Sequence, residues 1–390
     1  MADEKVRNQL EIALHVLKGM VLLSSLGYTN PDVPVMFQRA LELGDKVDNS
    51  PDLFTMIVGL WMYYLIKAEY GKAKELSDRM LSMAQESKDP PQLLQAYYCL
   101  GYTEYLIGNM GQAVAYLEQA VSWDCAGYDY TRQSPSQDDS RVHAYSMLAA
   151  SLWLWGDAAR SQLIQEKTFE LVDEVGQPYA EVWALYQRSL LHHMRRDFDK
   201  IHTSAGLALE IARTRGFTFF VPLTQFYLAF CIDNPAERLR KLRESHRQLV
   251  DAGAGSTQSY MLSSLAEQCI DQESLEEASI LLDRSRDFID QHGESLFEPE
   301  YLRVRARLLQ MSSESGAAQA RELLQRGVES ALEHGTPPLA LRCALALCEL
   351  GLPDDVNAEN ILRDVLGKFH SESEDKEFLM AKTILEKLHV

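Results

Sequence analysis

A pair of helical patterns joined by a short turn recurs along the whole chain at a spacing near 40 residues. It is clearest in AYYCLGYTEYLIGNMGQAVAYLEQAV, residues 96–121, where two apolar helical segments meet at Gly108. Aligning the chain on the residue that opens each second helix gives matches 37 to 48 residues apart. The matches are Val33, Ala73, Ala113, Ser161, Ile201, Arg238, Ala278, Ala320 and Ala358. Such a regular return indicates a repeat protein.

The repeat predicts an all-α fold. Two helices cannot bury their apolar faces alone, so eight or nine such pairs must stack into one continuous core. No long run alternates with period two, and no Asn-Gly hairpin turn occurs. Gly101, Ala113 and Ala120 fit stacked helices, because small residues let two backbones cross at roughly 8–10 Å. We therefore expect a right-handed α-solenoid of about eight to nine helical hairpins, with residues 1–390 forming one superhelical domain.

The two ends and one loop depart from the regular pair. The long interval between Ala113 and Ser161 predicts an insert loop at 122–141. A capping helix is expected within 374–390, since a terminal repeat needs a polar outer face. Its expected inward residues are Phe378, Leu379, Ala381, Ile384, Leu385 and Leu388. The first helix, 9–26, is apolar over most of its surface, so we expect an upstream domain or a second copy of the chain to cover it.

The charge of the chain limits the classes of partner that it can bind. The 57 acidic and 38 basic residues give a net charge of −19, which repels nucleic acid and anionic membrane surfaces. The longest apolar runs, such as 221–232, are too short to span a bilayer. Six cysteines contain no CxxC pair and indicate buried thiols in a reducing compartment. We expect a cytoplasmic protein that binds neither nucleic acid nor membranes.

The quoted stretch resembles the tetratricopeptide repeat (TPR). The matching positions are Tyr97, Leu100, Gly101, Ala113, Leu117 and Ala120. Tyr97 stands where Trp is usual, and Glu104 stands where the motif has an aromatic residue, with Tyr105 one place away. The spacing near 40 exceeds the 34 residues of a TPR, which implies longer helices.

Longer stretches resemble one particular TPR array. LGYTNPDV (26–33), PDLFTMIV (51–58) and LRDVLGKF (362–369) are similar to the C-terminal helical region of certain bacterial signalling proteins. Those proteins combine a class III adenylate/guanylate cyclase domain, a STAND-type ATPase and a TPR tail. Gln137-Asp138 matches an element of that family, although Asp139-Ser140 replaces its Pro-Gly. The resemblance implies a regulatory module, either a piece of such a protein or a free-standing relative.

No catalytic motif is found in the sequence. A phosphate loop requires GxxxxGK[ST], and GAGST at 253–257 lacks the lysine, so it is interpreted as a loop between pairs. His192 and His193 are adjacent and point to different helix faces, which favours a surface or groove position over a metal site. The basic segment 238–247 spreads around its helix and is interpreted as a solvated face. We expect a non-enzyme without cofactor or metal.

The remaining candidate is the concave groove. In TPR arrays the first helix of each pair lines this surface, so the resemblance implies a column of partner-binding side chains. Its members are Tyr98, Tyr102, Tyr105, His143, Trp153, Trp183, Tyr186, His193, Tyr227, Phe230, Arg303 and Arg307. Aromatic residues and arginine carry much of the binding energy at protein interfaces. For any one of the aromatic residues, a place in the core is an equally good interpretation.

Two functions fit these observations. The first is a non-catalytic interaction or regulatory module that binds a protein or peptide in the groove. The second is a sensor that binds a small inducer in a pocket of the same groove. A peptide would bury an extended strip, whereas a small ligand would occupy only one or two repeats.

Overall fold

The computed structural model describes residues 51–132, 138–312, 316–351 and 356–387, together with eleven single positions before residue 40. Most of the expected first helix, 9–26, and the first repeat match, Val33, lie outside these residues. The expectation that another domain or chain covers that helix therefore stays a prediction. In the described part of the chain there is no strand.

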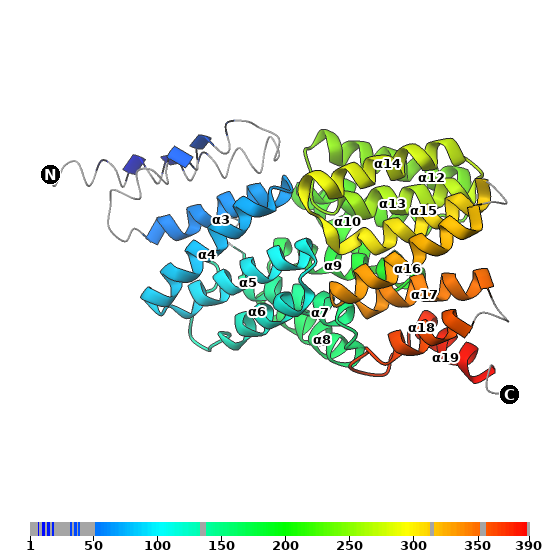
Figure 1. Cartoon of the computed structure of the whole chain (residues 1–390). Coiled ribbons are helices and arrows are strands. Elements are labelled where there is room, and N and C mark those ends of the chain that lie inside the picture. Colours follow the sequence, from blue (N-terminus) through cyan, green and yellow to red (C-terminus); the bar gives the residue numbers. More distant parts are fainter. Residues whose placement is uncertain are drawn as a thin grey trace.

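The described helices form eight successive pairs and a final single helix (Figure 1). The pairs are α3 (Pro51–Ile66) with α4 (Tyr70–Ser87), α5 (Pro90–Ile107) with α6 (Met110–Ser122), α7 (Ser140–Leu154) with α8 (Ala158–Val175), α9 (Pro178–Met194) with α10 (Phe198–Arg215), α11 (Phe220–Ala229) with α12 (Pro235–Asp251), α13 (Gln258–Asp271) with α14 (Leu275–His292), α15 (Glu298–Ser312) with α16 (Ala317–Glu333), and α17 (Pro337–Gly351) with α18 (Val356–Leu366). A short 3-10 turn, η1 (Ser295–Phe297), precedes α15, and α19 (Lys376–Lys387) ends the described chain. The predicted solenoid of helical hairpins is confirmed.

The repeat matches identify the buried start of nearly every second helix. Ala73, Ala113, Ser161, Ile201, Ala278, Ala320 and Ala358 are all buried. The fifth pair differs, because Arg238 is partly exposed and its guanidinium donates to the carbonyl of Ile232. There the buried positions are Leu239 and Leu242. The match at Arg238 was therefore wrong by one residue.

Local signals explain where the helices begin and end. Pro90, Pro178 and Pro235 occupy the first turn of α5, α9 and α12, where a missing backbone N–H costs no helical hydrogen bond. Gly108 ends α5 at φ 97°, a left-handed conformation that side chains with a Cβ rarely adopt.

Gly101 lies where α5 crosses α6. A Cβ at this position would stand 2.5 Å from Leu117 Cγ and 3.2 Å from the carbonyl oxygen of Ala113. The small residue in the opening stretch is therefore needed for close packing of the pair, as the sequence predicted.

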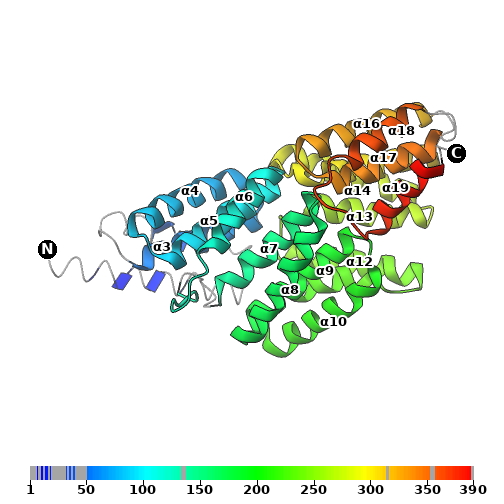
Figure 2. The same ribbon diagram turned by 90° about the horizontal axis from the view of Figure 1, so that it is seen from below.

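The later pairs return to the first four pairs, so the stack closes on itself along a line that we call the seam. The seam joins the turns 66–70, 107–110, 154–158 and 194–198 to the segments 252–257, 293–297, 334–337 and 367–375. Figure 1 shows α17 beside α7, and Figure 2 shows the chain from below. The backbone hydrogen bonds across it run from Gly255 to Ile66 (2.6 Å), from Met110 to His334 (3.2 Å) and from His370 to Gly156 (3.0 Å).

The segment before α19 crosses to the middle of the chain. The Asp375 carboxylate accepts hydrogen bonds from Trp153 Nε1 (2.7 Å) and from Arg195 Nε (2.8 Å). Phe378 and Ala381 of α19 are buried, but Leu379 is 49% exposed, so its predicted inward position was wrong. The C-terminal helix thus ends the stack and also holds the seam.

The predicted insert loop joins α6 to α7, and residues 133–137 of it lie outside the described residues. Asp139 accepts a hydrogen bond from the N–H of Arg141 and caps α7. The side chain of Asp139 therefore fixes the point at which α7 begins.

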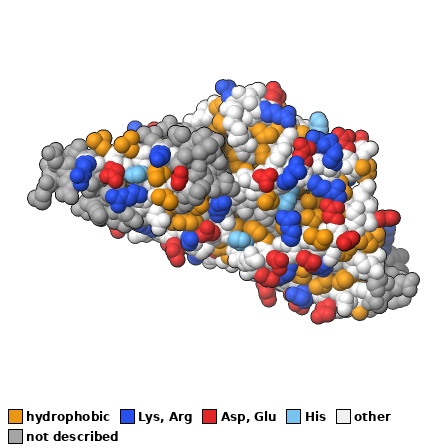
Figure 3. Space-filling view, turned by 90° about the horizontal axis from the view of Figure 1, so that it is seen from above, with side chains coloured by type: hydrophobic (Ala, Val, Ile, Leu, Met, Phe, Trp, Pro, Cys, Tyr) orange, Lys and Arg blue, Asp and Glu red, His pale blue; other side chains and the backbone are white. Residues whose placement is uncertain are grey.

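The surface shows no single dominant charge on the face in Figure 3, where Lys, Arg, Asp and Glu side chains lie interspersed. In the described part of the chain, no helix combines the length and the apolar character that crossing a membrane requires. On α12, Arg240 and Arg247 are exposed, in agreement with the interpretation of 238–247 as a solvated face.

Replacing Gly101 by Ala should lower the free energy of unfolding by about 1–3 kcal/mol, because the added methyl group overpacks the α5–α6 crossing. The matched control is Gly206→Ala on α10, where a Cβ meets nothing within 4 Å. That change should raise stability by about 0.5–1 kcal/mol through helix propensity. Urea unfolding followed by circular dichroism measures both, and equal effects at the two sites would contradict the predicted crossing.

Candidate binding pocket

Closing the seam encloses a pocket between the two halves of the chain. It holds about 670 Å³ of empty space, part of which is open to solvent. Its walls come from α3, α5, α7, α9, α11, α12, α13 and the loop before α13.

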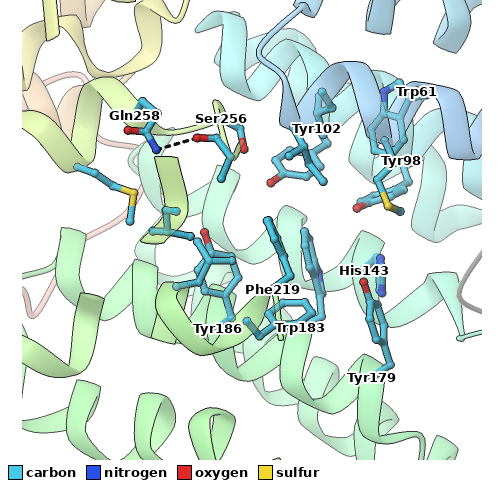
Figure 4. A pocket seen from close by; sticks show the side chains of 18 residues that line it. Trp61, Tyr98, Tyr102, His143, Tyr179, Trp183, Tyr186, Phe219, Ser256 and Gln258 are labelled. Atoms are coloured by element: carbon cyan, nitrogen blue, oxygen red, sulfur yellow. Dashed lines mark hydrogen bonds between the residues drawn. The ribbon is translucent and has the colours of Figure 1, made fainter. Parts of the chain in front are cut away.

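Aromatic rings form two facing walls of the pocket. Figure 4 shows Trp61, Tyr98 and Tyr102 on one side, opposite Tyr179, Trp183, Tyr186, Phe219 and His143. His143 stacks on Trp183 with ring centroids 4.9 Å apart. Tyr102 meets the edge of Trp183 at 6.0 Å. Contacts between the rings fix their orientation, since edge-to-face and offset stacked pairs are the favoured geometries.

Few polar groups line the pocket. Trp183 Nε1 is shielded from solvent and has no hydrogen-bond acceptor among the described residues. Gln258 donates to the carbonyl of Ala254 (2.9 Å), and its Oε1 lies 2.8 Å from His246 Nε2. The hydroxyl of Ser256 completes the polar part of the wall. No Lys, Arg, Asp or Glu is among the lining residues.

The tyrosine hydroxyls of the pocket stay protonated. Burial raises the pKa of Tyr98, Tyr102 and Tyr186 above the ordinary value. They therefore offer neutral hydroxyls that can donate or accept a hydrogen bond.

Two acidic side chains lie behind the aromatic walls. Asp138 forms an ion pair with His143 at the end of the pocket where α7 begins. Glu294 accepts hydrogen bonds from the Tyr70 hydroxyl (2.6 Å) and from the N–H groups of Thr257 (2.5 Å) and Ser259 (2.9 Å). Its place in the seam thus fixes the loop that carries Ser256.

The structure brings together five residues of the predicted column. Tyr98, Tyr102, His143, Trp183 and Tyr186 all line the pocket. They lie together because they belong to the first helices of the second, third and fourth pairs, and these helices face the same interior.

The other residues of the column do not face an open groove. Tyr105 and Tyr227 are fully buried in the core. Trp153 is buried and bonded to Asp375, and Phe230 packs on His193 with centroids 4.1 Å apart. Closure of the seam fills the space that an open superhelix would leave to solvent.

His193 is also buried, which corrects its predicted surface or groove position. Its Nδ1 lies 2.8 Å from the Tyr260 hydroxyl, and burial lowers its pKa to about 3. His192 is buried beside it, and burial lowers its pKa to about 4. In the described part of the chain, no group of acidic, histidine and cysteine side chains could hold a metal ion.

Arg303 and Arg307 belong to a cluster of ion pairs instead of a binding surface. Arg303 donates to Glu267 (2.6 Å) and to Glu300 (2.8 Å), and Arg307 donates to Asp271 (2.7 Å). The arginines hold the pKa of Glu300 at about 2 despite its burial, and that of Glu267 also falls below its ordinary value. The cluster extends to the seam, since Arg196 contacts both Glu267 and Glu300.

Sequence reasoning missed half of the pocket. Trp61 lies on a helix that is apolar on all sides, so no periodicity marks its inward face. The seam brings α11 and the loop 252–257 opposite α3 and α5. Only for this reason do Phe219, Phe220 and Ser256 line the pocket. Only Tyr179, on the same helix as Trp183, had a signal that could have been used, since the i, i+4 spacing puts both on one face.

The cysteine thiols do not have the environment of nucleophiles. Burial raises the pKa of Cys269 and of Cys343 to about 12, so neither forms a thiolate near neutral pH.

Comparisons with known proteins give the fold class. No protein-family model and no curated protein sequence matches the chain. Among solved structures, a Rap protein in complex with Competence and Sporulation Factor is similar over 98% of both chains, with a TM-score of 0.53 and 11% identity. The fold is that of a TPR-like α-solenoid.

Two further TPR-like structures align with lower scores. A STAND protein with a tetratricopeptide repeat sensor, from Pyrococcus horikoshii, matches 97% of this chain and 54% of its own, with a TM-score of 0.49 and 16% identity. Yeast Tom70 matches 98% of this chain and 79% of its own, with a TM-score of 0.43 and 14% identity. At these identities the likeness concerns the fold alone.

The stability of the TPR-like fold should fall as the pH is lowered from 6.5 to 4.5. The buried histidines have pKa values below their unfolded value of about 6.5, so the unfolded chain binds more protons in this range. Each such group lowers the free energy of unfolding by up to about 1.4 kcal/mol per pH unit. Urea unfolding at several pH values measures the slope.

The variant His193→Gln should have a shallower slope between pH 6.5 and 4.5, because it removes one of these groups and keeps an acceptor for Tyr260. His202→Gln is the control, since His202 is exposed on α10. An unchanged slope in His193→Gln would show that His193 is charged in the fold.

Proposed function

We propose that this chain is a non-catalytic regulatory module that binds a segment of a protein or peptide partner in the aromatic pocket. The pocket itself carries the proposal: it joins partly buried aromatic rings, neutral hydroxyls and an indole N–H without an acceptor. Aromatic side chains of this kind are the residues that most often anchor a bound partner.

Binding of a peptide partner between the helical pairs is also compatible with the fold. The Rap protein, which has a similar fold, was solved in complex with Competence and Sporulation Factor. We infer that the present chain binds its partner in its interior and not on its second helices. The sequence resemblance further suggests a bacterial, cytoplasmic signalling context with a cyclase or STAND ATPase. A longer reading frame encoding such a domain before residue 1 would support that context.

A small-molecule sensor is the second candidate. It is favoured because five residues of the predicted column line one pocket, whereas the others pack elsewhere in the fold. The experiment below separates the two functions.

Selection from a displayed library of random peptides should enrich sequences that bind the purified chain. Ser256→Phe should weaken their binding by roughly 30-fold, which corresponds to the loss of about 2 kcal/mol from one anchor. This change fills the pocket and removes no aromatic wall. Ser122→Phe, at an exposed position at the end of α6, is the matched control and should bind like the unchanged chain.

Equal binding by Ser256→Phe would place the peptide site elsewhere and contradict the proposal. If no peptide is enriched and a metabolite mixture yields a compound that binds the unchanged chain but not Ser256→Phe, the sensor function replaces the peptide function.

A further inference from the structure

The walls of the pocket are rich in rings and contain no fixed positive charge. Nine aromatic side chains, counting His143, line it, and no Lys or Arg does. The faces of Trp and Tyr rings carry negative electrostatic potential, which attracts a cation within about 6 Å of the ring centre. A pocket built only for an apolar side chain needs no such density of Trp and Tyr.

A buried carboxylate stands behind one wall. Glu294 accepts four hydrogen bonds, from Tyr70, Thr257 and twice from Ser259, and it is fully buried. Four groups of these three residues donate to it, which is the pattern of a carboxylate anion, and they oppose the burial that raises the pKa of Glu294. Among the described residues no Lys, Arg or His forms an ion pair with Glu294.

Glu294 lies directly behind the lining of the pocket. It accepts hydrogen bonds from the N–H groups of Thr257 and Ser259, which flank the lining residue Gln258. After the larger effects of burial and Tyr186, Glu294 also raises the pKa of Tyr102. Asp138 acts on Tyr98 in the same direction at the other end. At that end the His143 ring lies directly beside Asp138. The net charge of −19 adds a long-range attraction for cations.

The shape of the pocket favours a slender group on a longer chain. The free space inside the pocket is narrow, since only about 50 Å³ can hold the centres of water molecules. A lysine or arginine side chain has an apolar stem that suits such a narrow space, while its backbone would remain outside.

We propose that the pocket binds the positively charged side chain, lysine or arginine, of a peptide segment, held over the aromatic rings and facing the buried carboxylate of Glu294. This inference rests on the proposed function, in that the pocket is the site of peptide binding. It adds the chemistry of the anchor: a cation without a carboxylate partner in the wall. An apolar anchor of the same length is the alternative that the experiment must exclude.

Two matched pairs of probes test whether the pocket prefers a positively charged ligand to a neutral one of similar shape. The first pair is a glycine-flanked pentapeptide with a central lysine and the same peptide with norleucine, which has an alkyl chain of similar length and no ammonium group. The second pair is choline and its neutral isostere 3,3-dimethyl-1-butanol. Indole signals of the five tryptophans follow the titrations by NMR. The signals of Trp61 and Trp183, which line the pocket, should shift, and that of Trp123 should not.

The lysine peptide should bind at least about fivefold more tightly than the norleucine peptide, which corresponds to the usual strength of a cation over an aromatic ring. Trp183→Phe should reduce this ratio, because Phe attracts cations less than Trp does. Glu294→Gln should reduce it by removing the negative charge while keeping the size of the side chain. Trp123→Phe is the control and should keep the ratio.

Equal affinity within both pairs, or no binding of either cation, would overturn the inference. If the norleucine peptide binds at the same indoles as tightly as the lysine peptide does, the pocket takes an apolar anchor and the proposed function still stands. If choline binds and the lysine peptide does not, the cation comes from a small ammonium compound, and the peptide anchor is wrong. Should Glu294→Gln fail to fold, the ratio in Trp183→Phe decides the result.

Discussion

The buried carboxylate of Glu294 holds the two halves of the chain together. One of its oxygens accepts from Tyr70, at the start of α4, and both oxygens accept from the first residues of α13. Donors from the first and the sixth helical pair are thus satisfied by one side chain that has no access to solvent. A buried polar group of this kind costs much if a partner is lost. The position of the loop 252–257, and with it the rear wall of the pocket, depends on this network.

The local architecture could be predicted from the sequence because it depends on short-range rules. Buried Ala and Gly residues at the start of second helices recur at a fixed spacing, and Gly101 marks a crossing whose geometry any residue with a Cβ would disturb. Pro at the beginning of α5 and α9 marks the helix boundaries. The error at Arg238 has a local cause. Because α11 is only ten residues long, the alignment of the repeat on the next helix, α12, is shifted.

The closure of the stack could not be predicted from the same rules. It depends on how far each pair rotates relative to its neighbour, and small rotations add up over eight pairs. Some residues of the predicted column therefore line the pocket, whereas others are covered by neighbouring segments. Trp183 and Tyr186 line the pocket, whereas Trp153 is covered by the segment that carries Asp375. The ion pair between Arg303 and Glu267 was hidden for the same reason, because Glu267 lies on the neighbouring pair.

The seam changes how the stacked repeats fold and unfold. The hydrogen bond from Tyr70 to Glu294 joins residues 224 positions apart, and that from Trp153 to Asp375 spans 222. In an open solenoid every contact is between neighbours, so repeats can fray one at a time from either end. Contacts between distant parts of the chain raise the contact order and require a long loop to close before they form. Such a chain folds more slowly than an open array of the same length, and its end pairs lose their independence from the middle.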